Sequence, residues 1–355
     1  MHIPFKPLSL LSLLSLTVIA ASLSACGGGG GGGGGGTAIP PATFSSLAAT
    51  VPAASYGAIA NGSAFDLINQ IRSGAGAGKL MQSSALDLAA KSHTGYFMQN
   101  SNLDGAYIGA THEGVLGGHY EDPANLGFYG KTAQERATKA GYAGKARELI
   151  SFGAANSVDC IESLENSVYH LAQIISPLYV DVGISFESSS AGGTVCSIEL
   201  GLPGTTLGQL PAAGSVAIYP YAGQTAVAPT FYNRAEAPIP APDLNSAGHP
   251  VAVSLYSMAA PALVGSDIVI NEFSMKTVNG GTPVAVRVLA KSGVTSNMPG
   301  GPALSTDDAI ADAGVVFLLP TAPLAVNTTY KVTFAATLKG TAVTKDWSFT
   351  TGLNR

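Results

Sequence analysis

Helical periodicity stops near residue 204 of this chain, and this change limits the possible folds more than any other feature. Before it, Phe65, Ile68 and Ile71 in "NGSAFDLINQIRSG" recur at helical spacing. After it come only short β-rich runs separated by turn residues. The sequence therefore predicts two folded regions of different class, 55–204 and 205–355.

The first region is predicted to be α+β, with helices followed by a hairpin. Ser63, Ser84 and Thr132 are the expected helix N-caps, the last within a capping box that ends at Glu135. A further helix is expected over 158–175. The alternating runs "YVDVGISFE" and "GTVCSIELG" then predict two strands joined by a Ser/Gly turn.

The second region is predicted to be a β-sandwich. Seven β-rich runs are expected as strands: "SVAIYPY", "HPVAVSLY", "SDIVINEFSMKTV", "TPVAVRVLA", "GVVFLLP", "TTYKVTFAATL" and "TKDWSFTTG". The ending, with its Pro-led turn, "NTTYKVTF" and "WSFTTG", resembles the last strands of bacterial Ig-like domains. His249, beside Pro250, is expected at the surface or at a strand edge.

The N-terminus predicts export. Residues 1–25 combine Lys6 with an apolar run that is too short and Ser-rich to span a membrane. The sequence Leu23-Ser24-Ala25-Cys26 resembles a bacterial lipobox, which implies cleavage before Cys26 and its modification with lipid such as palmitate. An ordinary signal peptide with an incidental cysteine is the alternative. By analogy with lipoprotein sorting, Gly27 favours the outer membrane, facing either the periplasm or the cell surface.

Residues 26–54 are predicted to be a tether. Ten consecutive glycines, 27–36, have no side chains to pack, and an Ala/Pro/Ser-rich stretch follows them. Cys160 and Cys196 are left as an even pair for an oxidising compartment, where either a disulfide or two buried thiols would suit.

The charge pattern excludes a nucleic-acid binder. Only 11% of the residues are charged, the formal net charge is −5, and no Lys/Arg cluster is present to neutralise phosphates. Against this background, "GGHYEDPANLGFYGKTAQER" stands out, because it concentrates His119 and two carboxylates in one loop.

Three residues are the candidates for chemistry. They are His119 in that loop, Glu148 before the apolar "LISFG", and His170 beside the buried stripe of a helix. A buried carboxylate needs a partner, although Glu148 could equally form a surface ion pair with Arg147 or Lys145. His93, in mid-helix, is expected to be a packed structural histidine.

The same blocks resemble the CAP superfamily of cysteine-rich secretory, antigen 5 and pathogenesis-related proteins, in its bacterial SCP-like form. The blocks are "SALDLAAKSHTGYFMQN", "GHYEDPANLGFYGKTAQERATKAGY", "ELISFG" and "SVYHLAQIISPLYVDVGISFE", in the family's order. The resemblance spans roughly residues 60–200. It implies an α-β-α sandwich for 55–204.

The resemblance also implies a cavity that holds two histidines and one or two glutamates. His119, Glu148 and His170 match three of these positions. The chain departs from the family at Arg147 and Leu149, where Gly and Asn flank the family's glutamate. It also has Leu164 in place of a tryptophan, and the second glutamate has no clear match.

These three residues suit either a divalent cation such as zinc or a metal-free hydrogen-bonded triad. The first functional hypothesis is an envelope lipoprotein whose cleft binds a lipid, glycan or protein ligand. The alternative is a hydrolase that uses the same cluster, with Ser167 as the nearest candidate nucleophile. A purely structural envelope protein is the third hypothesis, and whether the protein is an enzyme stays open.

Overall fold

The computed structural model describes residues 42–56, 59–190, 192–310 and 312–353. The predicted signal peptide, the predicted lipidation site Cys26 and the polyglycine tract lie outside the described residues. The described residues belong to one compact unit.

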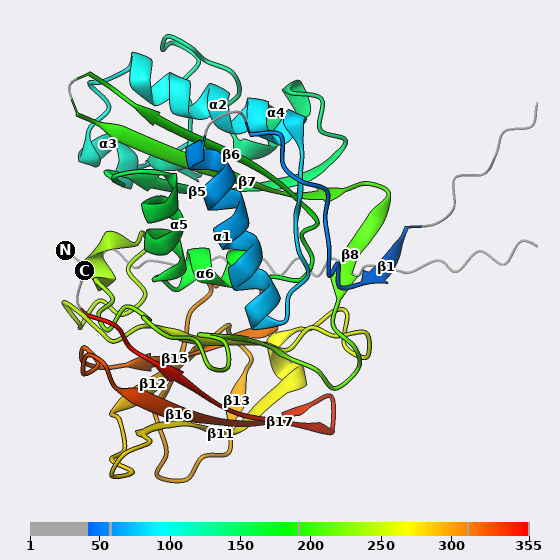
Figure 1. The fold of residues 1–355 in the computed structure, drawn as a ribbon, viewed down its shortest axis with the longest axis vertical. Helices are drawn as coiled ribbons and strands as arrows, with labels where there is room; N and C mark the ends of the chain where they lie inside the picture. Colours follow the sequence, from blue (N-terminus) through cyan, green and yellow to red (C-terminus); the bar gives the residue numbers. More distant parts are fainter. Residues whose placement is uncertain (1–41, 57–58, 191, 311, 354–355) are drawn as a thin grey trace, which may run out of the picture. The chain divides into compact units, whose positions relative to one another are not determined.

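The first region is layered as predicted, with helices on both faces of a sheet (Figure 1). The sheet has the order β2 (Met81–Gln82), β6 (Asp181–Ser188), β7 (Thr194–Pro203), β5 (Gly144–Phe152). Helices α2 (Ser84–Gln99) and α4 (Ala133–Lys139) cover one face, and α1 (Ile59–Ala75), α5 (Ser157–Glu165) and α6 (Tyr169–Ile174) lie on the other. The short α3 (Gly105–Gly109), the pair β3 (Thr111–His112) and β4 (Val115–Leu116), and the 3-10 turn η1 (Gly117–His119) connect α2 to α4. Mixed helices and sheets of this kind are consistent with the predicted α+β class.

Helix boundaries differ from the sequence predictions in three places. α1 begins at Ile59, so Ser63 lies inside it, and α2 is capped by Ser83 rather than Ser84. Thr132 caps α4 as predicted, accepting a hydrogen bond from the backbone N–H of Glu135 at 3.2 Å. The helix expected over 158–175 is instead two helices, α5 and α6, with a break at 166–168.

Both faces of the sheet are buried, and period-two alternation divides their side chains. Cys196, Ile198 and Leu200 of β7 belong to the core that includes α1, α5 and α6. Ser197 and Glu199 therefore point to the opposite face, which α2 covers. Polar residues of β7 and β5 are thus enclosed between the sheet and α2.

Close approach of α2 to the sheet depends on a glycine. A Cβ added at Gly183 would lie 2.1 Å from the backbone carbon of Leu86, so a larger residue there would push the helix away. Gly183 pairs with Glu199 on β7, which places this tight contact directly beside the enclosed polar residues.

The second region contains the seven expected strands, together with short additional ones. One sheet has the order β14 (Leu304–Thr306), β12 (Val286–Ala290), β15 (Val315–Pro320), β10 (Val251–Ser254), β9 (Ala217–Tyr219). The other has the order β13 (Thr295–Ser296), β11 (Ile268–Thr277), β16 (Thr329–Leu338), β17 (Thr341–Thr350). Pairing is antiparallel except for β12–β14 and β11–β13. The Ig-like assignment stays a prediction.

His249 is not at the surface, contrary to expectation. Its side chain is fully buried beside the ring of Tyr219, and neither ring nitrogen has a hydrogen-bond partner among the described residues. Burial lowers the pKa of His249 to about 3, so the ring is neutral and packs as an aromatic residue.

Part of the predicted tether is structured. β1 (Thr43–Ser46) pairs in parallel with β8 (Thr206–Leu210), and the backbone N–H of Ala48 donates to Gln209 Oε1 at 2.7 Å. Phe44 packs against the main core. The stretch that follows the glycines thus contributes a strand because an aromatic side chain interrupts its small and polar residues.

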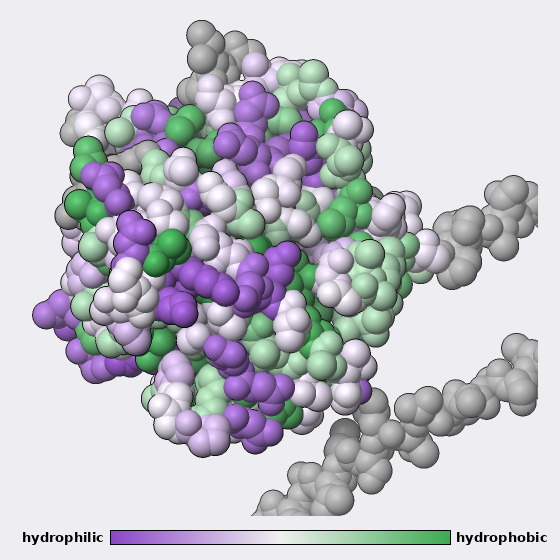
Figure 2. Space-filling model, turned by 60° about the horizontal axis from the view of Figure 1, so that its bottom comes forward, coloured by the Kyte–Doolittle hydropathy of each residue, from purple (hydrophilic) through white to green (hydrophobic). Residues whose placement is uncertain are grey.

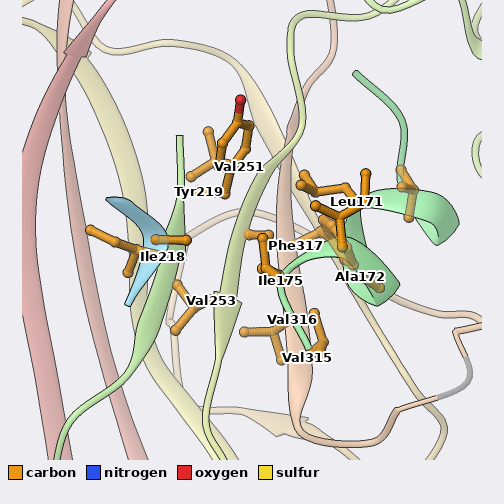
Figure 3. Close-up of a cluster of buried hydrophobic side chains, with 14 of the residues drawn as sticks. Leu171, Ala172, Ile175, Ile218, Tyr219, Val251, Val253, Val315, Val316 and Phe317 are labelled. Atoms are coloured by element: carbon orange, nitrogen blue, oxygen red, sulfur yellow. The ribbon is translucent and has the colours of Figure 1, made fainter. Parts of the chain in front are cut away.

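Helix α6 joins the two regions through a shared core. Its residues Leu171 and Ala172, with Ile175 just beyond it, lie against side chains of β9, β10 and β15 (Figure 3). Hydrophilic and hydrophobic residues are interspersed on the molecular face shown in Figure 2. Of the helices in the described ranges, none has the length and apolar character needed to cross a bilayer.

Candidate functional site

Two of the three predicted residues contact each other directly. His119 ends η1, Glu148 lies in β5, and His119 Nδ1 is 2.9 Å from Glu148 Oε2. The Glu148 side chain is only 1% exposed, whereas that of His119 is 25% exposed. The predicted surface ion pair of Glu148 with Arg147 or Lys145 is therefore absent from the described residues, and Glu148 instead orients an accessible imidazole.

Glu148 is ionised because buried cations surround it. Burial alone would raise the pKa of its carboxyl, but the charges of Arg136 and His93 and the hydrogen bond from His119 outweigh burial and hold the pKa below its usual range. Arg136 donates to Oε2 at 2.9 Å, and the Ser197 hydroxyl donates to Oε1 at 2.8 Å. An ionised carboxylate can only accept, so His119 Nδ1 carries a proton and Nε2 is the nitrogen left for a ligand.

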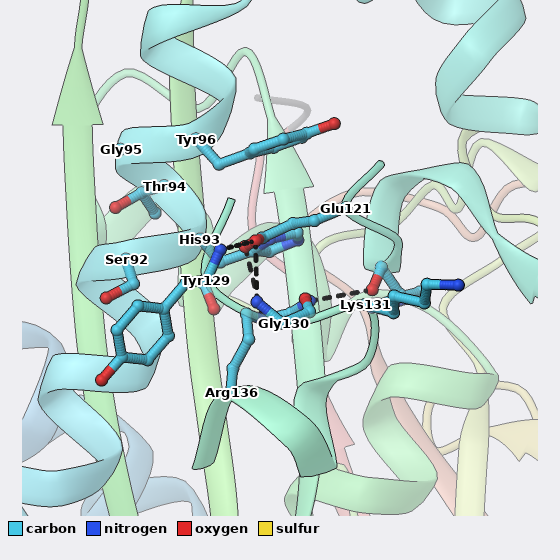
Figure 4. Close-up of polar contacts among 12 residues, drawn as sticks. Ser92, His93, Thr94, Gly95, Tyr96, Glu121, Tyr129, Gly130, Lys131 and Arg136 are labelled. Atoms are coloured by element: carbon cyan, nitrogen blue, oxygen red, sulfur yellow. Dashed lines mark hydrogen bonds and ion pairs between the residues drawn. The ribbon is translucent and has the colours of Figure 1, made fainter. Parts of the chain in front are cut away.

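A second buried pair, His93 and Glu121, supports the first (Figure 4). His93 Nδ1 lies 2.9 Å from Glu121 Oε1, and His93 Nε2 lies 2.9 Å from the carbonyl oxygen of Gly118. Both ring nitrogens face acceptors, so both bonds form only when the ring carries two protons. His93 and Arg136 then balance the charges of Glu121 and Glu148, as a buried cluster requires.

Glu121 and Arg136 also fix the loop that carries His119. Glu121 Oε2 accepts from the backbone N–H groups of Tyr129 at 2.6 Å and Gly130 at 3.1 Å. Arg136 donates to the carbonyl oxygens of His119 and Gly130, both at 3.2 Å. His93 is the structural histidine expected from the sequence, and it holds a loop rather than filling an apolar core.

Glu199 is the unusual member of this buried group. It is the cross-strand neighbour of Glu148 and is fully buried, and among the described residues only the Glu148 carboxylate is available as a partner for its carboxyl oxygens. Burial first, and then the charge of Glu148, hold the pKa of Glu199 well above its usual range, so this carboxyl is neutral.

The third predicted residue, His170, has a different carboxylate partner. Its Nδ1 lies 3.1 Å from Glu236 Oε1 and 3.2 Å from the Ser167 hydroxyl oxygen. Glu236 also accepts from the backbone N–H groups of Val168 at 2.8 Å and Tyr169 at 2.7 Å. Because Glu236 holds these N–H groups, the chain starts a new helix at Tyr169 instead of continuing α5.

His119 and His170 nevertheless share one cleft. Both line a cavity of about 150 Å³, together with Arg147 and Gln173. Both also line an adjoining cavity of about 320 Å³. The walls of this larger cavity are mainly apolar and include Ile108, Leu116, Ile150, Phe152 and Phe231. On the other side of His119, a wider cavity of about 880 Å³ includes the exposed Lys145 and Arg147.

The proposed three-ligand metal set does not form. Both oxygens of Glu148 are already bonded, and the guanidinium of Arg136 opposes a cation beside them. Within the described part of the chain, no three His, Cys, Asp or Glu side chains are grouped to hold a metal ion. Zinc sites in proteins need three or four such ligands, so His119, His170 and Glu148 do not fit one.

Cys160 and Cys196 are joined as a disulfide, with their Cα atoms 6.3 Å apart. The bond connects α5 to the central strand β7. Both cysteines are fully buried, and the bond lies on the α1/α5 side of the sheet, away from the cluster of buried charges.

The domain encloses a sheet between helices and places a paired imidazole and carboxylate at a cleft. Residues 65–198 match the model of the cysteine-rich secretory protein family, CAP, so a CAP domain is present in this part of the chain. A CAP domain indicates a ligand-binding or partner-binding role in general.

Other comparisons add little. The solved structure of an outer surface protein from Borrelia burgdorferi is 15% identical, with a TM-score of 0.31 over 39% of this chain and 89% of that one. No curated protein matches the sequence. The assignment therefore depends on the family model.

Sequence reasoning missed three of the charged residues that build the site, Arg136, Glu199 and Glu236. It noted Glu121 as one of the two carboxylates of the loop but gave it no role. Glu199 could have been noticed, because it lies in a strand that alternates between the two faces of the sheet. If helices cover both faces, a charged residue in such a strand must be buried. Glu236 lies far along the chain in an irregular segment, and no local pattern marks it.

Proposed function

We propose that the CAP domain binds a small amphipathic ligand, with an oxyacid head group and an apolar body, in the cleft between His119 and His170. The observation that carries the proposal is that two histidines from separate segments line the same cavities, and that Nδ1 of each lies within 3.1 Å of a buried carboxylate oxygen. Burying a carboxylate costs free energy of desolvation, and apolar side chains would fill a core without that cost.

The chemistry of the head group follows from the ring nitrogens. With both Nδ1 atoms engaged, the two Nε2 atoms are left for a ligand. A weak oxyacid suits them in either state, because its O–H donates to a neutral Nε2 and its anion accepts from a protonated one. Arg147 lines the same small cavity and favours the anion.

The larger cavity supports an apolar body. Its volume of about 320 Å³ is in the usual range for small-molecule sites, which are mostly apolar with a few polar groups that orient the ligand. 1-Naphthoic acid is a suitable probe. A ligand of about a dozen heavy atoms that gains about 0.3 kcal/mol per atom binds with a Kd on the order of 1 mM.

The test is NMR of the full chain labelled with ¹⁵N-histidine, titrated with 1-naphthoic acid and, as a matched ligand, 1-naphthamide. We expect the signals of His119 and His170 to shift together with one dissociation constant, and the acid to bind more tightly than the amide. The variant His119→Gln should weaken binding at least tenfold, whereas His112→Gln, outside these cavities, should not. Shifts of neither ring at millimolar acid would contradict the proposal.

A hydrolase remains the second candidate, because the His119–Glu148 pair is a suitable general base for activating water. Ser167 is a poor nucleophile. Its hydroxyl donates to the carbonyl oxygen of Leu164 at 2.7 Å, and the nearest nitrogen of His170 is the Nδ1 that faces Glu236. A hydrolase would show ester cleavage that is lost in His119→Gln and kept in Ser167→Ala.

We further propose that the protein is anchored to the outer membrane through lipid on Cys26, as the sequence Leu23-Ser24-Ala25-Cys26 suggests. Mass spectrometry of membrane-extracted protein should find acyl groups on an N-terminal Cys26. Cys26→Ser should release the protein from the membrane fraction, and retention of unacylated Cys26→Ser there would contradict the anchor.

A further inference from the structure

Glu236 is a buried carboxylate that reaches the site from outside the CAP match. It lies at the end of the 3-10 turn η2 (Asn233–Ala235), more than thirty residues beyond residue 198, and is 2% exposed. Its contacts are all donors that belong to one helix start. They are the backbone N–H groups of Val168, Tyr169 and His170, at 2.8, 2.7 and 3.2 Å, and Nδ1 of His170 at 3.1 Å.

Among the described residues, Glu236 is the only carboxylate that contacts the His170 ring. The other partner of Nδ1, the Ser167 hydroxyl, has already given its proton to Leu164, so it can only accept there. Both partners therefore favour a proton on Nδ1, and Glu236 is the one that adds a negative charge beside it. Glu148 has the same effect on His119, but from within the CAP domain.

The helix that carries His170 is also packed against the β-rich region. Leu171, Ala172 and Ile175 pack against side chains of strands β9, β10 and β15 (Figure 3). The Tyr169 hydroxyl donates to Asp307. These contacts fix the position of α6 from the side opposite to the CAP sheet.

The segment around Glu236 also forms one wall of the cleft. Phe231, Tyr232 and the run 235–237 line the cavity of about 320 Å³, and Ala237 and Pro238 line the smaller one. Tyr232 is 63% exposed, so its ring is placed at the mouth of the cleft.

We propose that the ligand site is built by both halves of the chain, with Glu236 as the positioning residue for His170 and Tyr232 as a residue that selects the apolar body of the ligand. The role of Tyr232 rests on the proposed function, whereas the action of Glu236 on the ring of His170 is independent of any ligand. The β-rich region is then a working part of the site rather than a spacer.

Glu236→Gln is the sharpest variant because it keeps the size of the side chain. An amide has one acceptor oxygen, whereas the carboxylate uses both, so Gln cannot accept from Val168 and from the His170 ring together. The matched control is Asp243→Asn, which neutralises an exposed carboxylate of the same region that pairs with Arg287.

The first readout is the tautomer of His170, measured from ¹⁵N shifts of the ring in full-length protein without ligand. We expect Nδ1–H to predominate in the wild type and in Asp243→Asn, and a smaller share of Nδ1–H in Glu236→Gln, where the neutral Ser167 hydroxyl still accepts from Nδ1 but the carboxylate charge is gone, with His119 unchanged. A merely structural cap would lower Tm and leave the tautomer of His170 as it was. That outcome would overturn the role of Glu236.

The second readout is binding of 1-naphthoic acid. We expect Tyr232→Ala to weaken it at least threefold, while Met258→Ala, an exposed apolar control in the same region, leaves it unchanged. Equal binding by Tyr232→Ala and wild type would overturn the two-part site even if Glu236→Gln fails to fold. If the wild type does not bind the acid, the proposed function fails, while the tautomer of His170 still tests Glu236.

Discussion

At the scale of single residues, the domain buries a group of charged side chains beside the cleft, where their desolvation is unfavourable. His93, Glu121, Arg136 and Glu148 are each at most 1% exposed in their side chains, and they form one connected group. Their contacts hold His119 at the cleft. The site is therefore preorganised by groups that do not themselves reach a ligand.

Arg136→Met should destabilise the protein by about 3–5 kcal/mol, because it leaves the buried carboxylate of Glu148 without its closest cation. Urea unfolding followed by circular dichroism measures this loss. Lys131→Met is the control, since its ion pair with Glu113 is exposed and should change stability little. Equal effects of the two substitutions would show that the buried pair is not needed.

Glu199→Gln should change how stability depends on pH. The pKa of Glu199 is raised in the folded protein, so above the ordinary carboxyl pKa the unfolded chain ionises while the folded protein keeps its proton, and stability falls as the pH rises. Glutamine cannot ionise, so the stability of the variant should increasingly exceed that of the wild type in the pH range above the ordinary carboxyl pKa.

The measurement for Glu199 is urea unfolding across that pH range. Glu148 has the opposite sign, since its lowered pKa gives stability that is lost as the pH falls through the acid range. Parallel pH profiles of the wild type and Glu199→Gln would contradict the burial of a neutral Glu199.

Site residues could be predicted from the sequence where their local sequence context was unusual. His119 and Glu148 were proposed together, and the structure pairs them. Glu236 could not be found, because its partners are backbone N–H groups far away in the chain.

Elements of the CAP domain were predictable where local signals define them. Strands β6 and β7 follow from alternation, and α4 follows from its Thr132 cap. The division of the helix expected over 158–175 was not predictable, because a carboxylate from the other half of the chain captures the N–H groups at the break. Helix starts also shifted, by five residues for α1 and by one residue for α2.

The disulfide is the main covalent link between elements. Replacing both Cys160 and Cys196 by alanine should lower the free energy of unfolding by about 2–5 kcal/mol, because the unfolded chain loses a crosslink. Urea unfolding with and without dithiothreitol measures it. The reductant should destabilise the wild type and leave the double variant unchanged, and alkylation of two thiols in native unreduced protein would contradict the link.

At the scale of the whole molecule, the described residues belong to one compact unit. Its two regions were predicted from their different periodicities, but their joining was not, because periodicity within a segment says nothing about its packing partner. The core around α6 contains side chains from both regions (Figure 3).

A fragment that ends at residue 204 should not fold cooperatively. It would expose Leu171, Ala172 and Ile175 and lose Glu236 from the start of α6. Calorimetry should find one transition for residues 42–355 and none for 42–204. A fragment that melts cooperatively at the temperature of the full chain would show that the CAP domain stands alone.

The central claim is that two imidazoles from distant segments act in one cleft, and a double-mutant cycle on 1-naphthoic acid binding tests it most directly. Dissociation constants are needed for the wild type, His119→Gln, His170→Gln and the double variant. Residues that share a ligand should give a coupling free energy of about 0.5–3 kcal/mol. Effects that add to within about 0.3 kcal/mol would mean that the two histidines act independently, and would contradict a shared cleft.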